Sequence, residues 1–427
     1  MIVTEGRMTS SLVRARRRLA MGIALLGMLL ATVPASAQDA KYTFSERNQK
    51  KMLQVIELLR TEGTDEEVAA NRAQAKQILL DINLKRAKPY GRARILNLLG
   101  TLAAQDEDYE TALKYLEESV AEDALQPADQ LNALYLVGQL QTMLERYDDA
   151  IVTLEKWISQ VETPAPASYY TLAVTYYQAG RAQDAIAPAK KAVELADTPR
   201  EAWYRLLLSL HLERQEYKEA LAILDDIILK FPSKAYWSQM AAIYSEMDQM
   251  DKSLAVQQLA KYEGFIKEDR DLTRMAQMFM VEGLPHRGAE IMKKGLEDGS
   301  IAPTMQAYQT YSDSLLQSRE WALAVEPLAK AAAMSDNGAL YVRKAQVHLQ
   351  LGEWENARAS LSQAFDKGGL ADEGQAHILS GIAAANEKKW DAAMAAFERA
   401  TRYEGTRETA EQWKGYIERE KARLGES

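Results

Sequence analysis

The sequence contains no cysteine and is poor in glycine and proline, with 22 Gly and 11 Pro in 427 residues. Without cysteine there can be no disulfide, no thiolate metal site, no cysteine nucleophile and no cysteine-linked lipid anchor. Glycine and proline are the residues that most disfavour a helix interior, so their scarcity favours a chain of long helices.

Basic residues are outnumbered, with 52 Lys and Arg against 61 Asp and Glu and a net charge of −9. Five of the arginines but only one glutamate fall within residues 1–37, so the rest of the chain is more acidic still. Binding to nucleic acid or to an anionic membrane surface needs a basic patch. We therefore expect no nucleic-acid partner, and membrane contact only through other proteins.

Residues 1–37 have the pattern of an export signal. Arg14 and Arg16 to Arg18 precede an apolar run from Leu19 to Val33, and Ala35-Ser36-Ala37 ends the segment. The run of about 15 residues is shorter than the roughly 20 that a membrane-spanning helix needs. We expect cleavage after Ala37 and export to the periplasm. The alternative is a signal that stays uncleaved as an anchor.

Known catalytic and metal-binding motifs are missing from the sequence. No phosphate-binding loop, dinucleotide fingerprint or nucleophile elbow occurs, and the four histidines have no paired ligand spacing. His211 and His348 fit core positions of helices, His377 the start of a helix and His286 a turn. We therefore expect no metal, no cofactor, no small-molecule substrate and no enzyme activity.

A repeat runs through the chain and supplies its main structural signal. Small residues recur every 33 to 38 positions, at Ala112, Ala150, Ala185, Ala220, Ser253, Gly288, Ala324, Ala357 and Ala393. Six of these nine residues follow a Tyr or Trp by three positions. Twelve residues before each of these, a second small residue recurs, with Leu208 as the exception. A third recurs seven residues after, with Trp157 and Ile227 as exceptions.

This linked pattern resembles the tetratricopeptide repeat (TPR), a hairpin of two helices that cross closely at small residues. The resemblance implies an all-α solenoid, a superhelix of about nine stacked hairpins. We divide the chain into the signal peptide (1–37), a divergent N-terminal hairpin (38–89), repeats 1–2 (90–162), repeats 3–9 (163–405) and a C-terminal capping helix (406–427). Residues 163–166, Thr-Pro-Ala-Pro, mark the clearest interruption.

In TPR proteins the first helices of the hairpins line a concave face. The positions that this resemblance places there carry uncharged polar and apolar side chains with a cluster of tyrosines. Tyrosine gives a large contact area at low entropic cost, which suits peptide recognition. The predicted protein-binding groove comprises Tyr135, Gln139, Tyr170, Val174, Tyr177, Arg205 and Leu212. The alternative is that some of these tyrosines only pack between hairpins.

Residues 236–265 and 281–301 resemble a narrower group, the periplasmic TPR proteins that accompany TonB energy-transduction systems. The first segment carries a tryptophan-bearing helix, and the second reads VEGLPHRGAEIMKKGLEDGSI. The resemblance implies an accessory of the TonB–ExbB–ExbD complex, which drives nutrient import through outer-membrane receptors.

Two other functions stay open at the level of sequence. One is a general cell-envelope TPR scaffold for outer-membrane assembly, polysaccharide export or pilus biogenesis. The other is a periplasmic hydrolase, which the missing catalytic motifs disfavour. The sequence names neither the partner nor the imported substrate, and it does not give the oligomeric state.

Overall fold

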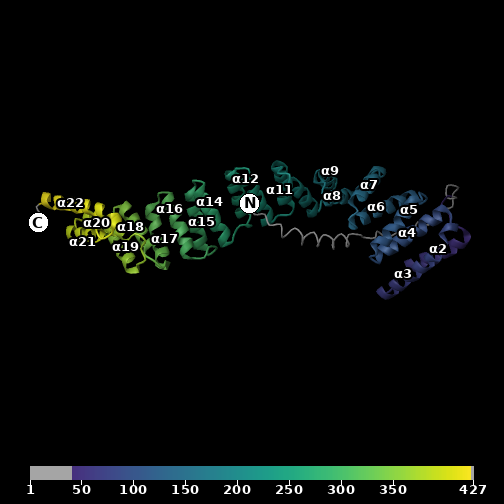
Figure 1. Cartoon of the computed structure of the whole chain (residues 1–427), viewed down its shortest axis with the longest axis horizontal. Helices are drawn as coiled ribbons and strands as arrows, with labels where there is room; N and C mark the ends of the chain where they lie inside the picture. Colours follow the sequence, from purple (N-terminus) through teal and green to yellow (C-terminus); the bar gives the residue numbers. More distant parts are fainter. Residues whose placement is uncertain (1–40, 425–427) are drawn as a thin grey trace. The chain divides into compact units, whose positions relative to one another are not determined.

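The computed structural model describes residues 41–424, so the expected signal peptide lies outside the described residues. Within that range the chain forms 21 α-helices and two short 3₁₀ helices, and no strand. The expected all-α fold of stacked helical hairpins is confirmed (Figure 1). The chain divides into two compact units between Ile223 and Leu224, within α11 (Tyr217–Lys230).

The first unit consists of successive helical hairpins. Its helices before α11 are α2 (Glu46–Arg60), α3 (Asp65–Leu80), α4 (Pro89–Gln105), α5 (Tyr109–Ala121), α6 (Pro127–Met143), α7 (Tyr147–Gln160), α8 (Pro166–Gln178), α9 (Ala182–Glu194) and α10 (Glu201–Glu213). The 3₁₀ helix η2 (Leu84–Arg86) links α3 to α4. The Thr-Pro-Ala-Pro segment separates α7 from α8, and its last proline is the first residue of α8, where a missing N–H costs no hydrogen bond.

The second unit continues the same pattern after α11. Its helices are α12 (Lys234–Glu246), α13 (Met250–Tyr262), α14 (Asp269–Val281), α15 (Pro285–Asp298), α16 (Met305–Gln317), α17 (Trp321–Met334), α18 (Ala339–Leu351), α19 (Trp354–Lys367), α20 (Glu373–Asn386), α21 (Trp390–Ala400), η3 (Glu404–Thr406) and α22 (Arg407–Leu424).

The small residues of the repeat lie where the two helices of each hairpin cross. A Cβ added to Gly100 would lie 2.6 Å from Leu116 Cγ and 3.0 Å from the carbonyl oxygen of Ala112. A Cβ added to Gly381 would lie 2.5 Å from the ring of Phe397. These distances leave no room for a larger side chain, so the predicted register of the repeat is confirmed.

Two serines at small-residue positions also make hydrogen bonds between the paired helices. Ser253 Oγ donates to the carbonyl oxygen of Ala241 at 2.8 Å, and Ser119 Oγ donates to that of Ala93 at 2.7 Å. Both serines are buried, and the bond satisfies a hydroxyl that would otherwise be costly to bury. Serine therefore serves the close crossing as well as alanine does.

The turn inside each of the nine repeat hairpins contains one residue in the left-handed region, seven positions after the crossing residue of the first helix, which is Leu208 in one hairpin and small in the others. These residues are Glu107, Glu145, Gly180, Gln215, Asp248, Gly283, Arg319, Gly352 and Lys388. The next residue donates its backbone N–H to a carbonyl five residues back, as from Glu353 to His348 at 2.9 Å. This bond ends the first helix in the manner of a Schellman motif and aims the chain into the second helix.

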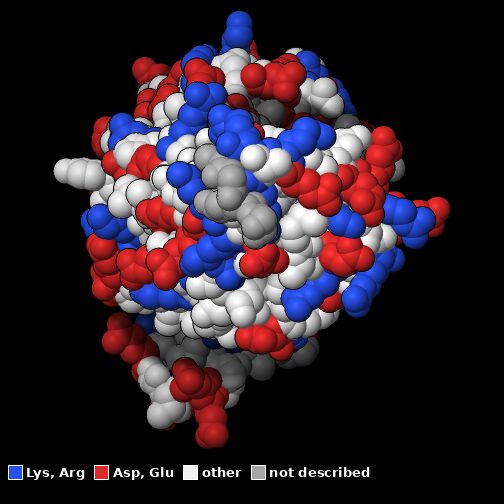
Figure 2. Space-filling model, turned by 90° about the vertical axis from the view of Figure 1, so that its left-hand side faces the viewer, with Lys and Arg blue, Asp and Glu red and all other residues white. Residues whose placement is uncertain are grey.

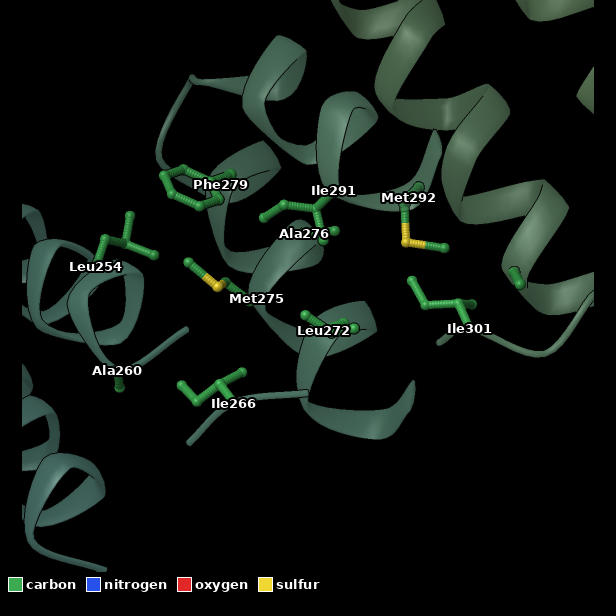
Figure 3. Close-up of a cluster of buried hydrophobic side chains, with 11 residues drawn as sticks. Leu254, Ala260, Ile266, Leu272, Met275, Ala276, Phe279, Ile291, Met292 and Ile301 are labelled. Atoms are coloured by element: carbon green, nitrogen blue, oxygen red, sulfur yellow. The ribbon is translucent and has the colours of Figure 1, made fainter. Parts of the chain in front are cut away.

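Each hydrophobic core is shared between neighbouring hairpins. In the second unit one cluster joins side chains of α13, α14, α15 and α16, among them Leu254, Met275, Met292 and Ala307 (Figure 3). In the first unit a similar cluster joins α4, α5 and α6. A hairpin alone would expose half of such a cluster, so the stability of each hairpin depends on the neighbouring hairpins.

The predicted N-terminal hairpin and the predicted C-terminal capping helix are both present. In α2, Met52 and Val55 are buried and Ile56 is half-buried, whereas Leu59 at the end of the predicted stripe is 36% exposed. At the other end α22 buries Ile417, and Trp413 stacks on Phe397 of α21 with ring centroids 5.6 Å apart. The second face of the last hairpin is thereby covered.

None of the helices between residues 41 and 424 combines the length and the apolarity that crossing a bilayer requires.

The crossing constraint predicts the effect of enlarging one small residue. Ala357 on α19 is fully buried, and replacing it by leucine should lower the free energy of unfolding by about 1–3 kcal/mol through overpacking. Ala359 lies on the same helix but is exposed, so Ala359→Leu should change stability by no more than about 0.5 kcal/mol. Urea denaturation followed by circular dichroism measures both; equal stability of the two variants would contradict the register.

Candidate protein-binding surface

The seven predicted groove residues lie on the first helices of three successive hairpins in the first unit. Tyr135 and Gln139 are on α6, and the others are on α8 and α10, namely Tyr170, Val174, Tyr177, Arg205 and Leu212. Arg205 is exposed, and the other six are half-buried. The sequence thus placed them on the expected helices, at positions that solvent still reaches.

Direct contacts join α6 to α8. The hydroxyl oxygens of Tyr135 and Thr171 lie 3.1 Å apart, and those of Thr142 and Thr175 lie 2.9 Å apart. The second pair is buried. These bonds hold the two helices side by side, so the exposed edges of their side chains form one surface.

Two of the tyrosines join α8 to α10. The ring of Tyr170 stacks on Trp203 with centroids 5.7 Å apart, and the Tyr177 hydroxyl donates to Glu213 Oε1 at 2.7 Å. Burial, followed by the hydrogen bond to the Glu213 carboxylate, raises the pKa of Tyr177 to about 12. Tyr177 therefore stays a neutral hydrogen-bond donor at every physiological pH.

Tyr135 has a packing role in addition to its place on the surface. Its ring lies 4.6 Å from that of Trp157 on α7, and burial raises the pKa of the Tyr135 phenol. Tyr135 thus connects both helices of its own hairpin to the next hairpin. The alternative that a groove tyrosine packs between hairpins describes Tyr135 well, whereas Tyr177 and Arg205 are better placed to meet a partner.

Sequence reasoning did not find the residues that orient these tyrosines, which are Thr171, Trp157, Trp203 and Glu213. One signal was available for Trp157, because it is a large residue at a repeat position that elsewhere is small. The larger ring reaches back to Tyr135 on the first helix. The other three lie one repeat away from the tyrosines that they contact, and a single sequence gives no pairing between repeats.

The histidines take no part in this surface. His348 is buried and His211 nearly so, and their Nδ1 atoms lie 2.6 and 2.7 Å from Glu353 and Glu216. His286 is in the first turn of α15, not in a connecting turn, and it contacts Glu320.

The fourth histidine, His377, lies in the second turn of α20, where its ring stacks 4.3 Å from that of Phe365. Among the described residues no group of three or more His, Cys, Asp or Glu side chains could hold a metal ion.

Charges of both signs are mixed over the visible surface. On the face that Figure 2 views, Lys and Arg are interspersed with Asp and Glu, and no large region has one sign. On the groove itself Arg205 is the one charged residue among the seven. Such a surface offers aromatic rings, hydroxyls, an amide and a single guanidinium, which suits an extended or helical protein segment.

Comparison with known families agrees with the hairpin geometry. A family profile described as tetratricopeptide repeat matches residues 97–164, 144–201, 170–236 and 342–405. Within these residues the helical hairpins match the tetratricopeptide repeat. No curated protein matches the sequence.

Solved structures resemble parts of the chain. The MamA protein has 18% identity and a TM-score of 0.34, covering 38% of this chain and 87% of its own. YrrB, described as a TPR protein with an unusual peptide-binding site, has 17% identity and a TM-score of 0.33, covering 39% and 83%. A TPR protein from Parabacteroides merdae has 15% identity and a TM-score of 0.29, covering 68% and 98%. At these identities the likeness concerns the fold alone.

The contacts of Tyr135 and Arg205 predict different effects on stability. Tyr135→Ala removes an aromatic pair and a bond between hairpins, and should lower the free energy of unfolding by about 2 kcal/mol. Arg205→Ala changes an exposed side chain and should alter it by less than about 0.5 kcal/mol. Thermal denaturation of the two variants measures this difference. If Tyr135→Ala were as stable as the wild type, the packing role of Tyr135 would be wrong.

Proposed function

We propose that this TPR protein is an exported, periplasmic scaffold that binds protein partners of the cell envelope through the face formed by α6, α8 and α10. TPR domains bind protein partners, and this face is the observation that carries the proposal. It joins three first helices by direct contacts and leaves Arg205 exposed and Tyr177 and Leu212 half-buried. The signal-like pattern of residues 1–37 supports the location.

The partner we propose is the TonB–ExbB–ExbD complex, with the protein acting as an accessory to nutrient import across the outer membrane. The support is the resemblance of residues 236–265 and 281–301 to TonB-associated TPR proteins. These segments correspond to α12 with α13 and to α15, and Trp237 on α12 lies 6.4 Å from Phe265, ring to ring. The tryptophan-bearing helix of the resemblance is therefore part of a packed hairpin.

The proposed role is binding and spacing and requires no catalysis. A stack of hairpins presents side chains from several repeats at fixed intervals, because each hairpin is packed on the one before it. The second candidate is a general envelope scaffold for outer-membrane assembly, polysaccharide export or pilus biogenesis. It would use the same surface and differ only in its partner.

Co-purification tests the proposed partner and surface together. A Tyr177→Ala, Arg205→Ala double variant should fold as the wild type does but recover much less TonB, ExbB or ExbD from detergent-solubilised envelopes of the native host. Interface residues of this kind can each be worth about 2 kcal/mol, or roughly 30-fold in affinity. The control is Lys190→Ala on α9, which changes an exposed residue of a second helix.

The outcomes separate partner from surface. If the wild type recovers none of the three proteins and a deletion strain imports every TonB-dependent substrate normally, the TonB assignment is wrong and the general scaffold replaces it. If the double variant recovers as much of the complex as the Lys190→Ala control does, the α6–α8–α10 face is not the binding surface. The proton gradient should be intact in the deletion strain in either case.

A further inference from the structure

Basic side chains gather in the first unit where α2 begins and the connection from α3 to α4 passes it. Two short segments supply them, residues 41–51 and 85–88, which hold seven Lys and Arg against a single acidic residue, Glu46. These seven residues form the basic patch: Lys41, Arg47, Lys50, Lys51, Lys85, Arg86 and Lys88. The chain as a whole has the opposite sign, with a net charge of −9.

Hydrogen bonds hold the two segments of the patch together. Lys51 Nζ on α2 donates to the carbonyl oxygen of Asp81, the C-cap of α3, at 3.3 Å. Lys88 Nζ donates to Thr43 Oγ1 in the segment before α2, at 3.0 Å. The 3₁₀ helix η2, which carries two of the seven residues, lies between these two contacts along the chain. The patch is therefore one surface, although its residues are distant in sequence.

Aromatic rings fix the segment that carries Lys41. The ring of Tyr90 on α4 lies 5.5 Å from that of Tyr42 and 5.3 Å from that of Phe44, centroid to centroid. All three rings are half-buried. The chain before α2 is thereby packed against the start of α4, and its basic residue stays beside the others.

The protein does not neutralise the charges of the patch itself. Within residues 41–424 none of the seven forms an ion pair, whereas Lys76 on α3 and Arg92 on α4 pair with Asp106 and Glu122. Six of the seven are exposed, and Lys51 is half-buried. Like charges held on one surface repel each other, so an external anionic surface is favoured there.

The position of the patch in the chain favours a membrane as that anionic surface. Lys41 follows Val33, the end of the apolar run, by eight positions. Eight residues span at most about 28 Å when fully extended. A chain that leaves the bilayer by this apolar run carries the patch close to the lipid headgroups.

An exposed leucine gives the patch the composition of a membrane-binding surface. Leu53 on α2 is 60% exposed and lies three residues after Lys50, so both side chains are on the same side of the helix. Basic side chains beside an apolar one are typical of helices that lie on anionic bilayers. An acidic protein segment would be recognised by the charges alone.

The opposite end of the α2–α3 hairpin has the opposite charge. Five acidic side chains accompany one arginine, Arg60, around its turn: Glu57, Glu62, Asp65, Glu66 and Glu67. Because α2 has 15 residues, its rise separates the two ends by about 22 Å. A hairpin charged in this way turns its basic end toward an anionic surface and its acidic end away from it.

We propose that the basic patch docks on an anionic phospholipid surface, where its Lys and Arg side chains pair with headgroup phosphates. The net charge predicts membrane contact only through other proteins, because it averages the patch with the acidic remainder of the chain. The proposal adds a site to the proposed function and does not depend on it, since no residue of the patch lies on α6, α8 or α10.

Vesicle co-sedimentation tests the proposal with the chain from Gln38 onward, which keeps every described residue and omits the apolar run. This protein should bind vesicles that contain phosphatidylglycerol at low salt and leave them at high salt, which screens the charges. Vesicles of phosphatidylcholine alone should not bind it.

A variant without the patch charges should bind roughly tenfold more weakly or less, since each basic residue near an anionic surface contributes about fivefold. It replaces four exposed residues by glutamine: Arg47→Gln, Lys50→Gln, Lys85→Gln and Arg86→Gln. The matched control removes the same charge from exposed residues of the second unit and should bind as the wild type does: Lys267→Gln, Arg270→Gln, Lys293→Gln and Arg402→Gln.

Four results would overturn the proposal. The wild type could fail to bind the anionic vesicles, or the patch variant could bind them as well as the control while circular dichroism shows both folded. Polyglutamate bound by the wild type but not by the patch variant, without vesicle binding, would make the patch a site for acidic protein segments. Salt-sensitive dimers that the patch variant loses, again without vesicle binding, would make it a contact between two copies. None of these results bears on the TonB assignment, because the co-purification variants leave the patch unchanged.

Discussion

The close crossing of two helices at small residues is the constraint on which the rest of the structure depends. At Gly100 and Gly381 even one added carbon would meet a neighbouring side chain, at 2.6 and 2.5 Å. Because every hairpin has nearly the same crossing, successive hairpins can pack in the same way and share their cores. One overlarge side chain would therefore disturb the packing of its own hairpin and of the two hairpins that pack against it.

The proposed binding surface follows from that stacking. In the first unit the first helices lie side by side and contact each other through threonine and tyrosine hydroxyls, as between Tyr135 and Thr171. Side chains from three repeats thereby reach one face, and each tyrosine is oriented by a residue of a neighbouring helix. In the second unit α22 covers the last core but leaves a corner formed by the aromatic rings of Trp413 and Tyr416 open, so the end of the stack differs chemically from its middle.

The fold was predictable from sequence at positions that have to meet only one physical requirement. Small residues at Ala112 or Gly138 serve only the crossing, and their spacing predicted the register. The left-handed turn residues were not predictable, because Glu107 and Lys388 occupy positions where glycine would have been the signal. The orientation of the groove tyrosines and the aromatic corner at Trp413 depend on contacts between repeats, which spacing along one chain does not contain.

Site-specific photo-crosslinking in the native host tests the central claim, that the first helices of the first unit bind a partner. A photoreactive amino acid in place of Arg205 on α10 should yield a crosslinked product containing TonB, ExbB or ExbD, detected by mass spectrometry. The same amino acid in place of Lys190, exposed on the second helix α9, should yield none. Crosslinks to these proteins from position 190 and none from position 205 would contradict the account.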